Sequence, residues 1–110
     1  AVEHHEDALS VQKKNLSMLI GGVGASEDQI LVVQSNLATT YKSLGRLDEA
    51  LRTARDVYSG RLKLQGEERE ETFLAANNYA NHLLELKRFE EAKSLFRKTI
   101  PVARRVSGDG

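Results

Sequence analysis

The sequence predicts an all-α protein in which antiparallel helix-turn-helix repeats stack side by side as an α-solenoid of about five helices. Three observations predict it. The stretch NLATTYKSLGRLDEA at residues 36–50 returns 42 residues later, at residues 78–92, as NYANHLLELKRFEEA. Apolar residues recur at a nearly helical spacing around both stretches. A fixed period of about 20–50 residues is typical of stacked units, which cannot bury their apolar faces alone.

The 42-residue register extends beyond these two stretches. When residues 34–66 are aligned with residues 76–108, eight pairs are identical, namely Asn36/Asn78, Ala38/Ala80, Leu44/Leu86, Arg46/Arg88, Glu49/Glu91, Ala50/Ala92, Arg55/Arg97 and Gly66/Gly108. One period upstream, the EDAL of residues 6–9 matches the DEAL of residues 48–51. The chain therefore opens halfway through a repeat. We expect one domain over residues 1–110, with a second helix of a partial repeat at 6–20 and two repeats at 27–66 and 70–108.

The first predicted helix spans residues 6–20 and ends at the glycine-rich segment 21–24. Ser26 followed by Gln29 resembles a capping box, which predicts that the next helix begins at Glu27 and runs to about Leu44. β-branched residues at 30, 32 and 33 favour a strand in isolation, but the repeat register overrules that local preference.

The later helices follow from the same register. Gly45 supplies a tight turn, and acidic residues at 48 and 49 suit the first turn of a helix that extends to about Leu64 and closes at Gly66. A further helix is expected from 70 to about 86, and the last begins at Phe89. Pro101 predicts a kink in this last helix, or an end at Ile100 with a separate turn beyond. The side chains expected to face inward are Ala8, Leu9, Leu16, Leu19, Ile20, Ile30, Val33, Leu37, Ala38, Tyr41, Leu44, Leu47, Ala50, Leu51, Ala54, Val57, Leu62, Leu64, Phe73, Leu74, Ala76, Tyr79, Ala80, Leu83, Leu86, Ala92, Leu95, Phe96, Ile100 and Val106.

The pattern resembles a known repeat family. A first helix with Asn-Leu-Ala and Tyr41, a short Gly-Arg or Lys-Arg turn, and then Asp-Glu-Ala or Glu-Glu-Ala opening a second helix is similar to the tetratricopeptide repeat. That repeat usually has about 34 residues, so the 42-residue period resembles the longer variety of kinesin light chain-type arrays. The chain departs from the pattern because it has no Trp, because Leu83 replaces the tyrosine of Tyr41, and because the expected proline near each repeat boundary is missing.

The resemblance implies a right-handed superhelix whose concave face is lined by first helices and binds a peptide or a partner protein. The positions implied for peptide binding are Ser35, Asn36, Thr39, Lys42, Ser43, Asn77, Asn78, Asn81 and Glu85. An Asn amide can donate to a peptide carbonyl and accept from a peptide N–H at once. The repeated Asn is equally consistent with a bond to a neighbouring helix or loop, and a solvated face is the favoured interpretation of Lys42 and Glu85. With one lysine opposed by one glutamate, we do not expect this groove to clamp acidic chaperone tails.

Composition excludes several classes of partner. The chain has 16 basic and 16 acidic residues, a balance that favours neither nucleic acid nor a membrane surface as a partner. It has no cysteine, which suits a reducing compartment, and no apolar run approaches the length of a membrane span or a signal peptide. We expect a cytoplasmic protein.

No residue pattern indicates catalysis, a cofactor or a metal. His4 and His5 are adjacent, and adjacent side chains on a helix point about 100° apart, so they do not converge on one ion. His82 stands alone beside an apolar stripe, where a histidine is usually structural. No nucleophile has a base partner, and we therefore expect no enzyme.

Two functions from different classes remain. The first is a protein–protein interaction module that acts as part of a longer repeat scaffold. The second is a structural spacer or self-associating segment, in which the terminal helices stack on other repeats or on copies of the chain. Leu9, Leu16 or Leu19 at one end, and Phe96 and Ile100 at the other, are the side chains expected to be left uncovered for such stacking.

Overall fold

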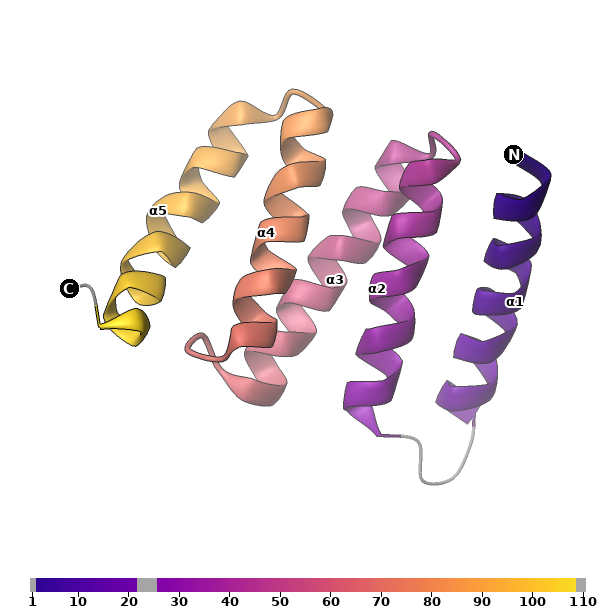
Figure 1. Cartoon of the computed structure of the whole chain (residues 1–110), viewed down its shortest axis with the longest axis horizontal. Helices are drawn as coiled ribbons and strands as arrows, with labels where there is room; N and C mark the ends of the chain where they lie inside the picture. Colours follow the sequence, from indigo (N-terminus) through magenta and orange to yellow (C-terminus); the bar gives the residue numbers. More distant parts are fainter. Residues whose placement is uncertain (1, 22–25, 109–110) are drawn as a thin grey trace.

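The computed structural model describes residues 2–21 and 26–108, and the side chains of residues 6–17 and 26–108. This part of the chain is helical, and its helices are α1 (Val2–Gly21), α2 (Glu27–Ser43), α3 (Leu47–Gln65), α4 (Glu70–Glu85) and α5 (Phe89–Ser107). Short turns join α2 to α3, α3 to α4 and α4 to α5 (Figure 1). α1 begins four residues earlier than expected, and the other helices begin within a residue or two of their predicted starts.

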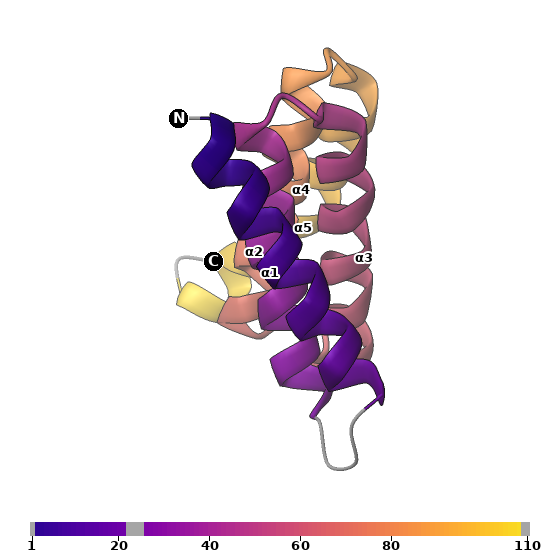
Figure 2. The ribbon, with the colours of Figure 1, turned by 90° about the vertical axis from the view of Figure 1, so that its right-hand side faces the viewer.

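Each helix packs against the next along the chain and runs antiparallel to it (Figure 1). α2 and α4 lie on one face of the molecule, and α3 lies behind and between them, as the side view confirms (Figure 2). The molecule measures 44 × 36 × 18 Å, so it is a slab about two helices thick. This is the expected all-α repeat architecture of stacked helix pairs, with the first helices on one face.

The turn inside each repeat is built twice, 42 residues apart. After α2, the N–H of Arg46 donates to the carbonyl of Tyr41 at 2.9 Å, and the N–H of Gly45 donates to that of Lys42 at 3.0 Å. After α4, Arg88 and Lys87 make the same two bonds to Leu83 and Leu84, at 2.8 and 3.0 Å. These bonds form a Schellman motif, which requires a left-handed residue after the helix. Gly45 fills that position with φ 76° and Lys87 fills it with φ 59°.

The core forms two clusters, one on each side of α3. The larger joins α3, α4 and α5 through buried residues that include Leu51, Tyr58, Leu83 and Leu95. The smaller joins α1, α2 and α3 through Leu9, Leu37, Tyr41 and Ala50. Leu9 is therefore covered by packing within the chain, contrary to the expectation that it is free for stacking. Leu16 is partly buried, and the expected contacts of Leu19 and Ile20 lie outside the described side chains.

Four side chains expected to face inward are instead exposed. They are Leu64, Leu74, Ile100 and Val106, each at least 40% exposed. Buried positions that the pattern missed are Leu31, Thr40, Tyr58, Arg61, Thr72, Ala75, His82 and Val102. The buried face of α4 runs through 72, 75, 76, 80 and 83, and a side chain two residues after 72 points to the opposite side of the helix. The apolar stripes predicted from the sequence extended too far around these helices at the four exposed positions.

α5 continues through Pro101, so the predicted end at Ile100 is wrong. A proline inside a helix removes one backbone hydrogen bond to the carbonyl four residues earlier, here that of Arg97. Both Pro101 and Arg97 are exposed, so that carbonyl lies on the solvent side of the helix. Leu95 and Val102, seven residues apart on the opposite side, are both buried and hold α5 against the rest of the molecule.

None of the helices in residues 2–21 and 26–108 combines the length and the apolar character that crossing a bilayer requires.

Candidate functional site

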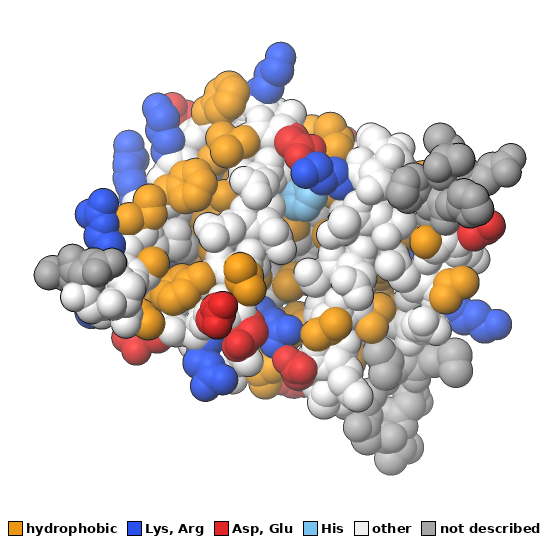
Figure 3. Space-filling view, in the orientation of Figure 1, with side chains coloured by type: hydrophobic (Ala, Val, Ile, Leu, Met, Phe, Trp, Pro, Cys, Tyr) orange, Lys and Arg blue, Asp and Glu red, His pale blue; other side chains and the backbone are white. Residues whose placement is uncertain are grey.

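A groove runs between α2 and α4, with α3 as its floor. We call it the α2–α4 groove, and it consists of two adjoining pockets that share Ser35, Val57, Ala75 and Asn78. Figure 3 shows this face of the molecule as mainly uncharged, with acidic and basic side chains toward two ends of the hollow. The residues that line the two pockets are Val32, Ser35, Asn36, Ala38, Thr39, Lys42, Ala54, Val57, Arg61, Glu71, Leu74, Ala75, Asn78, Asn81 and His82.

The floor of the groove is made of small apolar side chains. Ala38 of α2, Ala54 and Val57 of α3, and Ala75 of α4 are all buried. α3 contributes Ala54 and Val57, which are three residues apart and so share a helix face. Short side chains leave space above the backbone, so these residues leave room for a ligand over the floor.

Six of the nine predicted binding residues line the groove. They are Ser35, Asn36, Thr39, Lys42, Asn78 and Asn81. Ser43, Asn77 and Glu85 are exposed but do not line it. The hydroxyl of Ser43 donates to the Thr39 carbonyl at 3.2 Å, within its own helix.

The asparagine amides of the groove are not used inside the molecule. In the described part of the chain, the side chains of Asn36, Asn77, Asn78 and Asn81 make no hydrogen bond to protein. All four are exposed at the surface of α2 or α4. Donors and acceptors at the groove are therefore available to an external partner.

The first pocket ends at an ion pair. The Nζ of Lys42 lies 2.7 Å from the Oε1 of Glu85, which joins α2 to α4. Both side chains are partly exposed, so the pair adds little to stability. Its effect on the groove is to cancel the one positive and the one negative charge at this end.

A second ion pair lies at the other end of the groove. Arg61 of α3 is 7% exposed, and its Nη1 lies 2.6 Å from the Oδ1 of Asp28 at the start of α2. Glu71 of α4 faces the same pocket, with its Oε2 3.8 Å from the Nε of Arg69. The sequence reasoning did not single out Arg61. Its spacing could have indicated this position, because Arg61 lies seven residues after Ala54 and four after Val57 and so falls on the groove-facing side of α3.

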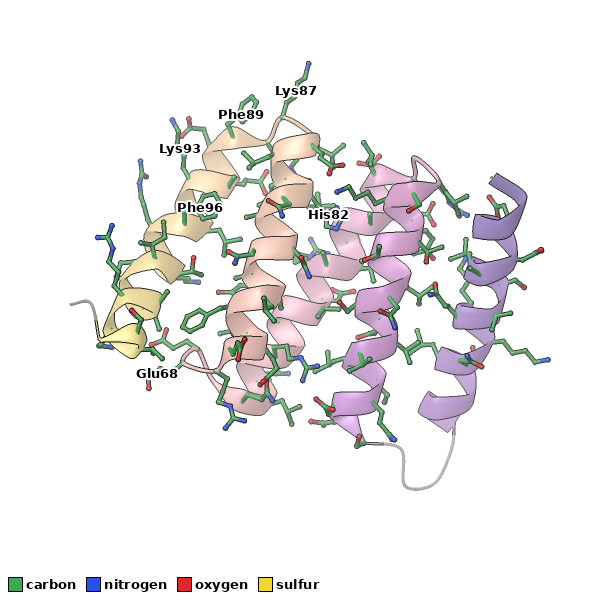
Figure 4. The ribbon with its side chains drawn as sticks, in the orientation of Figure 1. Glu68, His82, Lys87, Phe89, Lys93 and Phe96 are labelled. Carbon is green, nitrogen blue, oxygen red and sulfur yellow. The ribbon has the colours of Figure 1, made fainter. Side chains whose placement is uncertain are left out.

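His82 is the most enclosed polar side chain of the first pocket. It is 7% exposed, and Figure 4 shows it between α4 and the helices α2 and α3. Its Nδ1 is fully enclosed and has no hydrogen-bond partner among the described residues. Burial lowers the pKa of His82, Glu85 raises it and Lys42 lowers it further, with burial the largest of the three. The ring is therefore neutral at pH 7.

Among residues 6–17 and 26–108, no three His, Cys, Asp or Glu side chains gather closely enough to hold a metal ion. His4 and His5, which are not expected to converge on one ion, lie outside the described side chains. What the groove offers is hydrogen bonds from uncharged side chains above an apolar floor.

The comparisons with known proteins agree with this architecture. The family model for the tetratricopeptide repeat matches residues 29–105, and the chain belongs to that family. Among curated proteins, no sequence matches this chain.

The fold is also similar to a solved structure, the crystal structure of BtubC (BKLC) from P. vanneervenii. The TM-score is 0.79 at 22% sequence identity, and the match covers 96% of this chain and 41% of that chain. At this identity the likeness concerns the fold. The chain spans less than half the length of that structure.

Proposed function

We propose that this chain is a protein–protein interaction module that binds an extended peptide, or an extended segment of a partner protein, in the α2–α4 groove. The observation that carries the proposal is the row of asparagine amides that make no hydrogen bond to the described residues. An extended peptide presents a carbonyl and an N–H at each residue, and a side-chain amide can bond both.

The electrostatics of the groove favour an uncharged stretch of ligand. The Lys42–Glu85 and Arg61–Asp28 pairs place opposite charges together at the two ends. Between them the walls carry hydroxyl and amide groups. An anionic ligand group in the middle of the groove gives up hydration there without meeting an opposite charge, and the carboxylate of Glu71 also lines the groove.

We further propose that the chain acts as part of a longer repeat scaffold of the kinesin light chain-like variety in the cytoplasm. The 42-residue period supports the longer repeat, with α3 and α5 beginning at Leu47 and Phe89 and ending at Gln65 and Ser107. The similarity to a structure more than twice as long supports the longer array. In this arrangement residues 1–110 form one domain, in which a partial repeat precedes the repeats at 27–66 and 70–108.

The test is selection from a random peptide library on the purified chain. A variant with Asn36→Leu and Asn78→Leu removes two groove amides, and Asn77→Leu makes the same change outside the groove on α4. We expect the wild type and Asn77→Leu to enrich the same peptide pattern and the double variant to lose it, with helicity unchanged in all three. Enrichment that survives in the double variant contradicts binding in this groove.

A second function, a self-associating spacer, is favoured by the outer face of α5. Phe89 is 52% exposed and Ile100 is 43% exposed. Phe96 lines the same hollow as Ile100 and is partly packed against the core. One repeat earlier, the equivalent positions are Leu47, Ala54 and Tyr58, and Tyr58 belongs to the core cluster that joins α3 to α4. If α5 stacks on another copy, the mass in sedimentation equilibrium rises with concentration. A monomer mass at every concentration excludes this function.

A further inference from the structure

The outer side of α5 combines an exposed apolar hollow with basic side chains. The hollow is lined by Lys93, Phe96, Arg97, Ile100 and Pro101, and we call it the α5 hollow. Ile100 is exposed and Phe96 is partly buried, so apolar surface meets solvent here. Figure 3 shows several basic side chains along the outer edge of α5. The α5 hollow shares no lining residue with the α2–α4 groove, so it is a second candidate surface.

The shape of this surface suits a helix. α5 repeats α3 at a distance of 42 residues, and Ile100 is the equivalent of Tyr58. Tyr58 contacts α4, where the ring centroid of Tyr79 lies 6.1 Å from its own, and the two helices pack along each other. A helix can therefore lie on the outer side of α5 in the position that α4 takes against α3.

The side chains of this surface differ from those of α3 in charge. Leu51 and Leu62 of α3 pack in the core cluster that joins α3 to α4 and α5. One repeat later, the same positions are Lys93 and Arg104, which are both exposed. A helix that packed there with an apolar side would cover both charges without a partner, which costs free energy. The helix that fits α5 therefore brings acidic groups.

The chain itself leaves these basic side chains largely without counter-charges. The Nζ of Lys93 lies 3.5 Å from the Oε1 of Glu90, and the two side chains are 61% and 85% exposed. Arg97 and Arg104 form no ion pair with the residues that the structure describes. Lys93, Arg97 and Arg104 follow each other at intervals of four and seven residues, so they share the side of α5 that carries Ile100. A second copy that paired its own α5 with this one would bring like charges together.

We propose that the outer side of α5 is a docking surface for a helix of a partner protein that carries acidic side chains beside an apolar stripe. The apolar stripe covers the α5 hollow at Phe96 and Ile100, and the carboxylates meet Lys93, Arg97 and Arg104. This interaction goes beyond the proposed function, because the partner is a helix and lies outside the groove. An acidic membrane surface has similar chemistry, but the equivalence with the α3–α4 contact favours a helix.

The test uses two synthetic amphipathic peptides of about 18 residues, or five helical turns. Both carry the same stripe of leucines, flanked by glutamate in the acidic probe and by lysine in the basic probe. The reporters are the NMR signals of the Ile100 methyl groups and the Phe96 ring, with the side-chain amide of Asn78 as the signal of the groove. We expect the acidic probe to shift Ile100 and Phe96 saturably and to leave Asn78 unchanged. Its Kd should be about 3- to 100-fold lower than that of the basic probe, because each of about three exposed ion pairs contributes a factor of about 1.5–5.

Charge reversal connects this preference to α5. Lys93→Glu with Arg97→Glu should bind the basic probe more tightly than the acidic one. The matched control, Arg52→Glu with Arg55→Glu, makes the same change in net charge at exposed positions of α3 and should keep the preference of the wild type. If circular dichroism shows that the reversed variant is unfolded, Arg97→Glu alone should reduce the preference by a factor of at least about 2. Raising the NaCl concentration from about 50 to about 300 mM should weaken binding of the acidic probe to the wild type.

Three results with the probes overturn the proposal. They are equal binding of both probes to the wild type, a preference for the acidic probe that charge reversal on α5 leaves unchanged, and shifts at Asn78 in place of Ile100. The groove variant, Asn36→Leu with Asn78→Leu, separates this surface from the proposed function. It should bind the acidic probe as the wild type does, whether or not it still enriches library peptides, and loss of probe binding in this variant overturns docking on α5.

Two further measurements decide between a helix and other occupants. Binding of the wild type to phosphatidylcholine vesicles with about 30% phosphatidylserine, without binding of the acidic probe, assigns the surface to a membrane and overturns the proposal. A mass in sedimentation equilibrium that rises with concentration for the wild type but not for Ile100→Glu assigns it to a second copy and overturns it as well. We expect no vesicle binding and a monomer mass.

Discussion

Replacing Lys87 by glycine is expected to stabilise the chain. Lys87 has φ 59°, in the left-handed region, at the position that Gly45 occupies with φ 76° one repeat earlier. Its side chain is exposed and makes no hydrogen bond or ion pair with the described residues (Figure 4). Lys87→Gly removes the Cβ that the left-handed conformation crowds, and it keeps the N–H that donates to the Leu84 carbonyl at 3.0 Å.

The magnitude follows from two opposing terms. A left-handed L-residue costs about 1–2 kcal/mol, and glycine removes that cost. The greater conformational freedom of glycine stabilises the unfolded chain and so reduces the gain by about 0.4–1 kcal/mol. The net stabilisation is about 0.5–1 kcal/mol. For a domain of this size it corresponds to a Tm higher by about 2–6 °C.

Urea denaturation followed by circular dichroism at 222 nm measures the effect. Lys87→Ala keeps the Cβ and the left-handed strain, so we expect its free energy of unfolding to match the wild type. Gly45→Ala introduces that strain in the earlier repeat, and we expect it to destabilise by about 1 kcal/mol. A Lys87→Gly protein no more stable than Lys87→Ala refutes the argument.

Three further predictions follow from particular contacts. Pro101→Ala should stabilise by about 1–2 kcal/mol in thermal or urea unfolding, because it restores a helical N–H at an exposed position of α5; unchanged stability contradicts this. Thr72→Val should cost about 1 kcal/mol, since the 2% exposed Thr72 donates its hydroxyl to the Gly66 carbonyl at 2.8 Å and so ties the start of α4 to the end of α3. The matched change Thr99→Val, whose hydroxyl bonds within its own helix, should cost less. Burial places the pKa of His82 in the folded chain below its ordinary 6.5, so the unfolded chain binds more protons as the pH falls through 6.5. The free energy of unfolding should therefore decrease below that pH. His82→Gln should remove this contribution to the pH dependence of stability.

Most of the fold could be predicted from the 42-residue repeat. Because the 42-residue period aligns both turns, it predicted helix starts at 47 and 89 and a tight turn at Gly45. It also overruled the β-branched residues at the start of α2, where Ser26 and Gln29 form the capping box that their spacing predicted. The residues that match between the repeats form the same ion pair twice, at the start of each second helix. The Nε of Arg46 lies 2.6 Å from the Oε1 of Glu49, and the Nε of Arg88 lies 2.7 Å from the Oε1 of Glu91.

Other features depend on how helices are rotated against one another, which periodicity does not determine. Leu74 looks like a core residue by type, yet the face of α4 that packs on α3 passes through Thr72 and Ala75 instead. His82 was expected to be structural; it is buried, and it also lines the groove. Pro101 was expected to kink α5 or to end it at Ile100, and the helix continues through it, with Pro101 at an exposed position where a helix tolerates the missing hydrogen bond.

The candidate site was predicted in part. Six of the nine residues carried over from the repeat family line the groove. The alanines that form its floor and Arg61, at its far end, were missed as site residues because small or buried side chains on a second helix look like packing positions in a single sequence.

Binding in the α2–α4 groove is tested most directly by an NMR footprint of a peptide obtained by library selection. The account predicts saturable shifts of the side-chain NH₂ signals of Asn36, Asn78 and Asn81, together with the floor methyl groups of Ala54 and Ala75, while Asn77 and the outer face of α5 stay unchanged. Shifts confined to Phe89, Phe96 and Ile100 on α5, with the groove asparagines unmoved, contradict it.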